Sequence, residues 1–131
     1  FGITRWIDKR VPVIQQTGRR CKDGFVVWTL FHELGHVLED PRGEMHLEYS
    51  NEKKRNTAAE KAANAFALDV LFGESGMKPF RGLTRDQDIA KTAKRLGVAP
   101  GVAVHQMHRR RMLDYGFGNR HFVDLSGGFT A

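Results

Sequence analysis

The run of residues that most constrains the fold of this chain is WTLFHELGHVLED, at positions 28–40. It places His32, Glu33 and His36 among Trp, Leu, Phe and Val. Burying an imidazole or a carboxylate in such surroundings costs free energy unless a partner satisfies it. The fold therefore has to supply partners for these three side chains.

The spacing H-E-x-x-H predicts a metal site on a helix. Residues four positions apart share one helical face, one turn apart, so His32 and His36 can hold a single cation. Neutral imidazole is a good ligand for zinc, and catalytic zinc sites leave one position open for water. Glu33 points about a quarter turn away from His32, where it can accept a proton from the attacking water. The alternative is a helix with two incidental histidines, because this short motif also arises by chance.

Catalytic zinc usually takes three protein ligands. The downstream candidates for the third are Glu44, His46, Glu48, Glu52, Glu60 and Asp69. We favour Glu60, because it falls in line with Ala63 and Ala67 on the apolar stripe of a second predicted helix, whereas Asp69 falls on the far side. A buried carboxylate needs a partner, which a metal supplies. The alternative is that Glu60 only completes a capping box with Thr57. Asn64, one turn further on, is placed to hydrogen-bond a ligating histidine.

The remaining pattern predicts an α+β fold, mainly helical, with a small N-terminal antiparallel sheet. We expect strands at 3–7, 11–17 and 44–49, with Pro12 making the second an edge strand or a strand start. We expect helices at 24–38, 57–73, 84–96 and 100–112. Asp23 is the expected cap of the first, Thr84 and Gln87 form a capping pair for the third, and Gly97 ends the third.

Projection of the first predicted helix separates two faces. The apolar face consists of Val27, Leu30, Phe31, Leu34 and Leu38, and the two histidines lie opposite. Gly35 is a poor helix residue, and its lack of a side chain lets another segment or a substrate backbone come close.

Length and composition favour a single domain over residues 1–131. The longest uncharged apolar run, 24–31, is too short to cross a bilayer, so no membrane association is expected. Cys21 has no cysteine partner within the chain, which fits a reducing compartment and predicts a cytoplasmic protein. Because the chain begins at Phe1, we expect it to be a piece of a longer protein.

The net charge of +6 permits contact with nucleic acid or an acidic partner, although a solvated basic face is the simpler interpretation. Residues 84–112 also resemble a helix-turn-helix, with Arg109, Arg110 and Arg111 available for phosphates. This alternative makes the chain a DNA-binding module with at most a structural metal. The presumed recognition helix is mostly small and apolar in its first half, which leaves little to contact base edges.

Two stretches together, FVVWTLFHELGHVLED at 25–40 and AAEKAANAFALDVLF at 58–72, resemble the ImmA/IrrE family of metallo-endopeptidases. The similarity is to the branch in which this domain follows a XRE-type helix-turn-helix in bacterial regulators. It extends over nearly the whole chain and implies a zincin-like fold with one zinc ion per chain. The ligands implied are His32, His36 and Glu60, with Glu33 as general base and Asn64 at the family's asparagine. The family's second acidic residue is replaced by Ala62, which lies off the stripe, so no ligand should be lost.

The resemblance also implies that His108 polarises a substrate carbonyl or stabilises the oxyanion, although a partly exposed helix histidine beside Arg109 fits the sequence equally well. The expected function is a zinc endopeptidase of a bacterial or phage regulator of transcription or stress response, cleaving a partner repressor or regulator. DNA contact would come from a missing upstream domain or from the basic C-terminal part. A catalytically silent sensor or an antitoxin-like regulator that keeps the zinc fold stays open as a third possibility.

Overall fold

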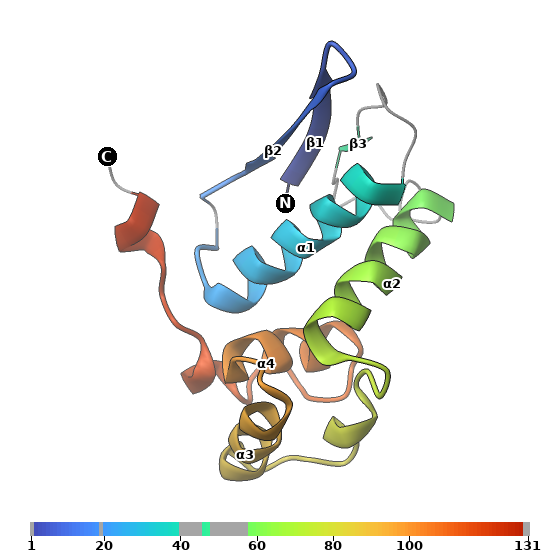
Figure 1. The fold of residues 1–131 in the computed structure, drawn as a ribbon. Helices are drawn as coiled ribbons and strands as arrows, with labels where there is room; N and C mark the ends of the chain where they lie inside the picture. Colours follow the sequence, from blue (N-terminus) through green and yellow to red (C-terminus); the bar gives the residue numbers. More distant parts are fainter. Residues whose placement is uncertain (1, 19, 40–45, 48–57, 130–131) are drawn as a thin grey trace. The chain divides into compact units, whose positions relative to one another are not determined.

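The computed structural model describes residues 2–18, 20–39, 46–47 and 58–129. Over these residues the fold is α+β and mainly helical, with a small antiparallel sheet near the N-terminus, as predicted (Figure 1). The chain forms two compact units. The first comprises Phe1–Arg19 and Trp28–Val70, and the second comprises Arg20–Val27 and Leu71–Ala131.

The sheet belongs to the first unit and has the order β2-β1-β3. Strand β1 (Gly2–Ile7) is antiparallel to β2 (Val11–Gln16) and to the two-residue β3 (His46–Leu47). A tight turn joins β1 to β2, with positive φ angles at Asp8 and Lys9. Pro12 lies on β2, an edge strand of the described sheet, which agrees with its missing N–H group. Apart from β3, the strand predicted at 44–49 lies outside the described residues.

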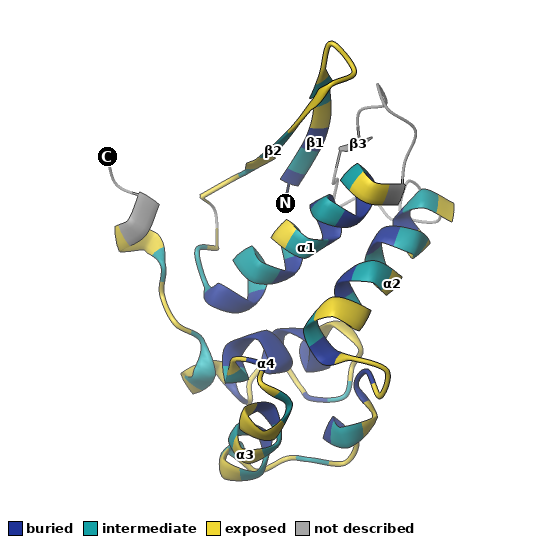
Figure 2. Ribbon diagram, viewed as in Figure 1, coloured by how far each residue is buried: buried dark blue, intermediate teal, exposed yellow. Residues whose placement is uncertain are grey.

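Helix α1 (Asp23–Glu39) agrees with the predicted helix to within one residue at each end. Its apolar face is not its buried face: Leu30 is 38% exposed and Leu38 is 66% exposed. The buried positions include His32, Glu33 and His36, together with Trp28 and Gly35 (Figure 2). The polar side chains of the opening motif are therefore inside the first unit.

Helix α2 (Ala58–Phe72) packs against this buried face. A Cβ atom added at Gly35 would lie 2.8 Å from the Cα of Ala63, so the two helices approach as closely as only glycine permits. Three positions of the predicted inward stripe, Glu60, Ala63 and Ala67, are buried, and Asp69 is exposed as predicted. Thr57, the other half of the alternative capping box, lies outside the described residues.

The second unit has its core between α3 (Asp86–Leu96) and α4 (Pro100–Arg109). The fully buried apolar side chains there are Phe80, Ile89, Ala93, Ala103, Val104 and Met107. The short 3-10 turns of this unit are η2 (Lys78–Phe80), η3 (Asn119–His121) and η4 (Ser126–Phe129). Gly97 ends α3 in the left-handed conformation, as predicted.

Two predicted helix ends in this unit are wrong. Helix α3 begins at Asp86 after Arg85, whose side chain makes no capping hydrogen bond, so the capping pair expected at Thr84 and Gln87 does not form. Helix α4 ends at Arg109 and not at 112. The chain there turns at Arg111, which has a φ of 57°, and the Met112 N–H returns to the Met107 carbonyl at 2.8 Å. This left-handed residue closes the helix one turn early.

Asp23 joins the start of α1 to the C-terminal segment within the second unit. Its Oδ1 accepts hydrogen bonds from the N–H groups of Gly24, at 2.9 Å, and Val123, at 3.0 Å. Asp23 is the first residue of α1 and not the residue before it, so the predicted N-cap is wrong, but its carboxylate links the helix start to a residue 100 positions away in sequence.

Candidate metal centre

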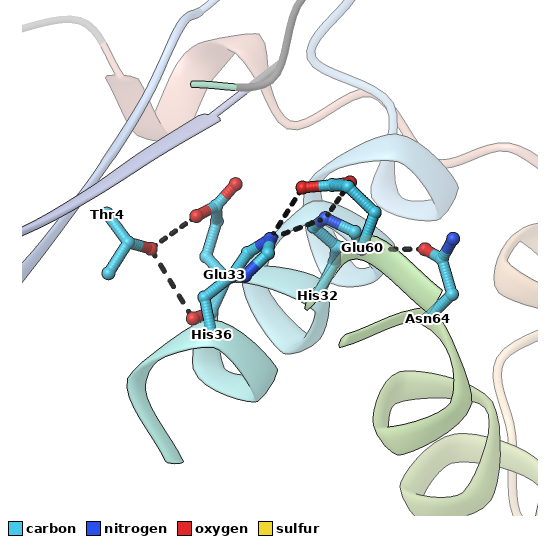
Figure 3. Close-up of polar contacts among 6 residues, drawn as sticks. All are labelled: Thr4, His32, Glu33, His36, Glu60 and Asn64. Carbon is cyan, nitrogen blue, oxygen red and sulfur yellow. Dashed lines mark hydrogen bonds and ion pairs between the residues drawn. The ribbon is translucent and has the colours of Figure 1, made fainter. Parts of the chain in front are cut away.

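Three buried side chains of the first unit converge at one point. His32 and His36 come from successive turns of α1, and Glu60 comes from the first turn of α2. The two Nε2 atoms lie 3.2 Å apart, and the Glu60 carboxylate spans them, with Oε2 3.1 Å from His32 and Oε1 2.8 Å from His36 (Figure 3). The three residues thus form a group that can hold a metal ion.

Asn64 contacts one of these two histidines. Its Oδ1 lies 2.7 Å from Nδ1 of His32. An amide oxygen only accepts hydrogen bonds, so Nδ1 of His32 carries the proton. In the neutral ring, Nε2 then presents a lone pair to the cluster. The predicted position of Asn64, one turn beyond Glu60 and beside a ligating histidine, agrees with this contact.

The donor atoms fit zinc. Zinc–ligand bonds of about 2.0–2.1 Å in a tetrahedron place neighbouring ligand atoms about 3.3 Å apart. The observed separations of 2.8–3.2 Å are close to this value. Lone pairs of two imidazoles and a carboxylate crowd together in a place shielded from water, which is unfavourable without a cation or protons between them. Two nitrogens and one carboxylate oxygen are also a common donor set of catalytic zinc.

Glu33 lies beside the cluster and has a different partner. In Figure 3 it stands between Thr4 and the two histidines, and the Thr4 hydroxyl donates a hydrogen bond to Oε2 of Glu33. Glu33 is fully buried and Thr4 is 1% exposed. Sequence reasoning missed Thr4. The only available signal was a polar residue at an alternating position of a predicted strand, and nothing in the sequence indicates which helix that strand faces.

None of the other candidates for the third ligand is placed beside the two histidines in the part of the chain that the structure describes. Asp69 is exposed on the far side of α2, as predicted. Glu44, Glu48 and Glu52 lie outside the described residues, and His46 is described only as part of β3.

His108 lies on α4, in the second unit, and only 3% of it is exposed. The expectation of a partly exposed histidine is therefore wrong. Its Nε2 donates a hydrogen bond to the Phe117 carbonyl at 2.7 Å, and its ring lies 5.1 Å from that of Tyr115. These contacts give His108 a packing role, and a role in catalysis stays a prediction.

The proposed recognition helix of the DNA-binding alternative is buried. Residues 101–108 of α4 all lie in the interior of the second unit (Figure 2), whereas a recognition helix must expose side chains to base edges. Arg109, the last residue of α4, and the two residues that follow it, Arg110 and Arg111, are exposed.

A buried His-His-Glu group with a neighbouring glutamate on the same helix is characteristic of metallopeptidase-like domains. Residues 27–108 match the model of the IrrE N-terminal-like domain (Peptidase_M78), and the chain belongs to this family. The resemblance inferred from the two helical motifs is thereby confirmed. No curated protein and no solved structure matches the chain. None of the described helices combines the length and the hydropathy needed to cross a bilayer.

Proposed function

We propose that this chain is the zinc-dependent endopeptidase domain of a bacterial or phage regulator, and that it hydrolyses a peptide bond in a partner protein. The observation that carries the proposal is the convergence of His32, His36 and Glu60 in a buried place, with Glu33 beside them. If the two histidines were incidental, there would be no reason for the carboxylate oxygens of Glu60, on another helix, to lie 2.8–3.1 Å from both Nε2 atoms.

Each residue then has a distinct role. His32, His36 and Glu60 hold the zinc ion, and Asn64 fixes the ring of His32. Bound zinc supplies a Lewis acid that polarises a carbonyl and makes water more acidic. Glu33 accepts the proton of the attacking water and returns it to the leaving amine as the peptide bond breaks. His108 remains a candidate for stabilising the oxyanion.

We propose a repressor or another regulator in the cytoplasm as the substrate, in a response to stress or a toxin–antitoxin-like setting. Membership of a peptidase family supports a protein substrate. DNA contact would come from an upstream domain of a longer protein or from the exposed arginines 109–111.

Zinc content tests the ligand set. We expect about one zinc per chain in the wild type by plasma mass spectrometry, and its loss in Glu60→Ala. Asp69→Ala removes an exposed carboxylate from the same helix and should keep the metal. If Glu60→Ala kept its zinc, the third ligand would have to be sought at Glu44, His46 or Glu48. A zinc-free wild type under metal-replete conditions would overturn the proposal.

Cleavage is tested without knowledge of the natural substrate. The zinc-loaded chain is incubated with a peptide library prepared from a bacterial proteome, and new N-termini are counted by mass spectrometry. Glu33→Gln should keep zinc and fold but produce no cleavage beyond background, since the amide cannot accept the proton. Cleavage by Glu33→Gln at the wild-type rate would exclude Glu33 as the base. Zinc without cleavage in the wild type would instead support the non-catalytic regulator.

A further inference from the structure

The contact between Thr4 and Glu33 joins the sheet to the proposed catalytic base. The Thr4 hydroxyl donates to Oε2 of Glu33 and also lies 3.4 Å from the backbone carbonyl of Glu33. A hydroxyl has one proton, and the charged carboxylate is the stronger acceptor of the two. The proton therefore goes to the carboxylate, in surroundings where Thr4 is 1% exposed and Glu33 is fully buried.

The backbone holds Thr4 firmly in place. It lies in the middle of the central strand β1, where its Cα partners are Ile14 on β2 and His46 on β3. Threonine is also β-branched, so few side-chain rotamers are open to its hydroxyl. The hydroxyl is thus presented from a rigid element.

The closeness of β1 to α1 depends on Gly2. A Cβ atom added there would lie 2.9 Å from Cγ2 of Thr29 and 3.1 Å from Cγ of Glu33. The missing side chain at position 2 lets the strand come near enough for Thr4, two residues along on the same face, to contact the Glu33 carboxylate. Strand β1 therefore passes close to the stem of Glu33 at Gly2 and contacts its carboxylate at Thr4.

We propose that Thr4 is a positioning residue, whose hydroxyl fixes the orientation of the Glu33 carboxylate for proton transfer. This inference rests on the proposed peptidase function. A glutamate side chain turns about three bonds, and a general base works only within hydrogen-bond reach of the proton it takes. With Oε2 held by Thr4, the other carboxylate oxygen keeps the direction away from Thr4 that Figure 3 shows.

The first test separates the hydroxyl from the packing of the side chain. Thr4→Val keeps the shape and removes the hydroxyl, and Thr4→Ser keeps the hydroxyl. Thr29→Val makes the same change on α1, one turn before Glu33, at a hydroxyl that has no hydrogen bond to the carboxylate among the described residues. Kinetics are measured on the peptide that the wild type cleaves best in the proteome library. We expect Thr4→Val to keep one zinc and an unchanged KM while kcat falls at least about tenfold, since small misplacements of catalytic groups cost up to about 100-fold. Thr4→Ser should recover most of the wild-type kcat, and Thr29→Val should retain it.

The second test does not depend on activity. Thr4→Val, Glu33→Leu and the double variant are compared by thermal unfolding of the zinc-loaded chain. Both single changes delete the same hydrogen bond, so their reductions in Tm should not add in the double variant. Additive reductions would overturn the proposed contact.

The kinetic outcomes distinguish this inference from the proposed function. An active wild type matched in kcat by Thr4→Val would overturn the role of Thr4 and leave the peptidase function standing. The same holds if Thr4→Ser is as impaired as Thr4→Val, because the hydroxyl would then not be responsible. A zinc-loaded wild type that cleaves no peptide of the library would overturn the peptidase function and, with it, the role of Thr4.

Discussion

The close approach of α1 and α2 at Gly35 predicts that one added methyl group weakens the metal site. In Gly35→Ala the new Cβ would lie 2.8 Å from Cα and 3.1 Å from the carbonyl oxygen of Ala63. Both atoms belong to the backbone, so no rotamer change relieves the overlap. Ordinary carbon–carbon contacts are about 3.5–4.0 Å, and the two helices would therefore have to separate by about 1 Å.

Two opposing terms set the effect on stability. Overpacking of this kind costs about 1–3 kcal/mol. Alanine is about 1 kcal/mol better than glycine inside a helix, which offsets part of that cost. The free energy of unfolding should thus fall by up to about 2 kcal/mol.

The effect on metal binding should be clearer. Glu60 lies three residues before Ala63 on α2, so it moves with the point of overlap, whereas His32 and His36 stay on α1. Metal–ligand distances tolerate only about 0.2 Å, well below the separation required. We expect the zinc affinity to fall at least about tenfold, or 1.4 kcal/mol, in competition with a chromogenic chelator.

The control is Gly116→Ala in the second unit, where an added Cβ meets nothing within 4 Å. This variant should bind zinc as the wild type does. Wild-type zinc affinity together with wild-type stability in Gly35→Ala would refute the argument, because the helices would then not be held at the distance observed.

Two further predictions concern Asn64 and His105. Asn64→Ala should lower the zinc affinity about 10- to 100-fold without abolishing binding, since His32 loses its orienting acceptor, and Lys61→Ala on the exposed side of α2 should not. The chelator competition checks both, and equal affinities in the two variants would contradict the role of Asn64. The pKa of His105 is lowered from 6.5 to about 3, mainly by burial and then by the charges of Arg109, His108 and Arg20. Below pH 6.5 the unfolded chain binds a proton that the folded chain does not, so stability should fall by about 1.4 kcal/mol per pH unit, or about 2 kcal/mol by pH 5. His105→Leu should lack this part of the pH dependence in urea unfolding, and an identical pH dependence in both proteins would show that folding does not lower the pKa of His105.

The sequence predicted which polar side chains converge better than it predicted the helix packing. Glu60 could be selected because a carboxylate on an apolar stripe needs a partner, and this physical requirement holds regardless of the surrounding fold. The buried face of α1 could not be read in the same way. Its apolar residues suggest an inward side, yet Leu30 and Leu38 are exposed while the histidines are buried. The face of α1 that is buried is the one that α2 approaches at Gly35. This approach depends on a residue without a side chain, so the apolar pattern does not indicate it.

The ends of α3 and α4 and the contact between Thr4 and Glu33 could not be predicted from the sequence, for different reasons. The capping pair at Thr84 and Gln87 fits a general pattern, but the helix begins two residues later, at Asp86. Helix α4 ends early because Arg111 adopts a positive φ. Positive φ is uncommon outside glycine, so an arginine gives no reason to predict a helix end there. Thr4 and Glu33 are 29 residues apart in sequence, and the pairing of β1 in the folded sheet brings them together.

The polar side chains of the opening motif are buried because each has a partner from another part of the first unit. His32 has Asn64 and Glu60 on α2, His36 has Glu60, and Glu33 has Thr4 on β1. Losing such a partner leaves a buried polar group unsatisfied, at a cost of about 1–3 kcal/mol, so each contact holds two elements together as well as orienting a group of the site. Helix α1 is thereby linked to α2 through the proposed metal ligands and to β1 through the proposed base. Substitutions at Asn64 should therefore affect metal binding, and substitutions at Thr4 should affect proton transfer. The two effects should be separate, because Asn64 contacts His32 and Thr4 contacts Glu33.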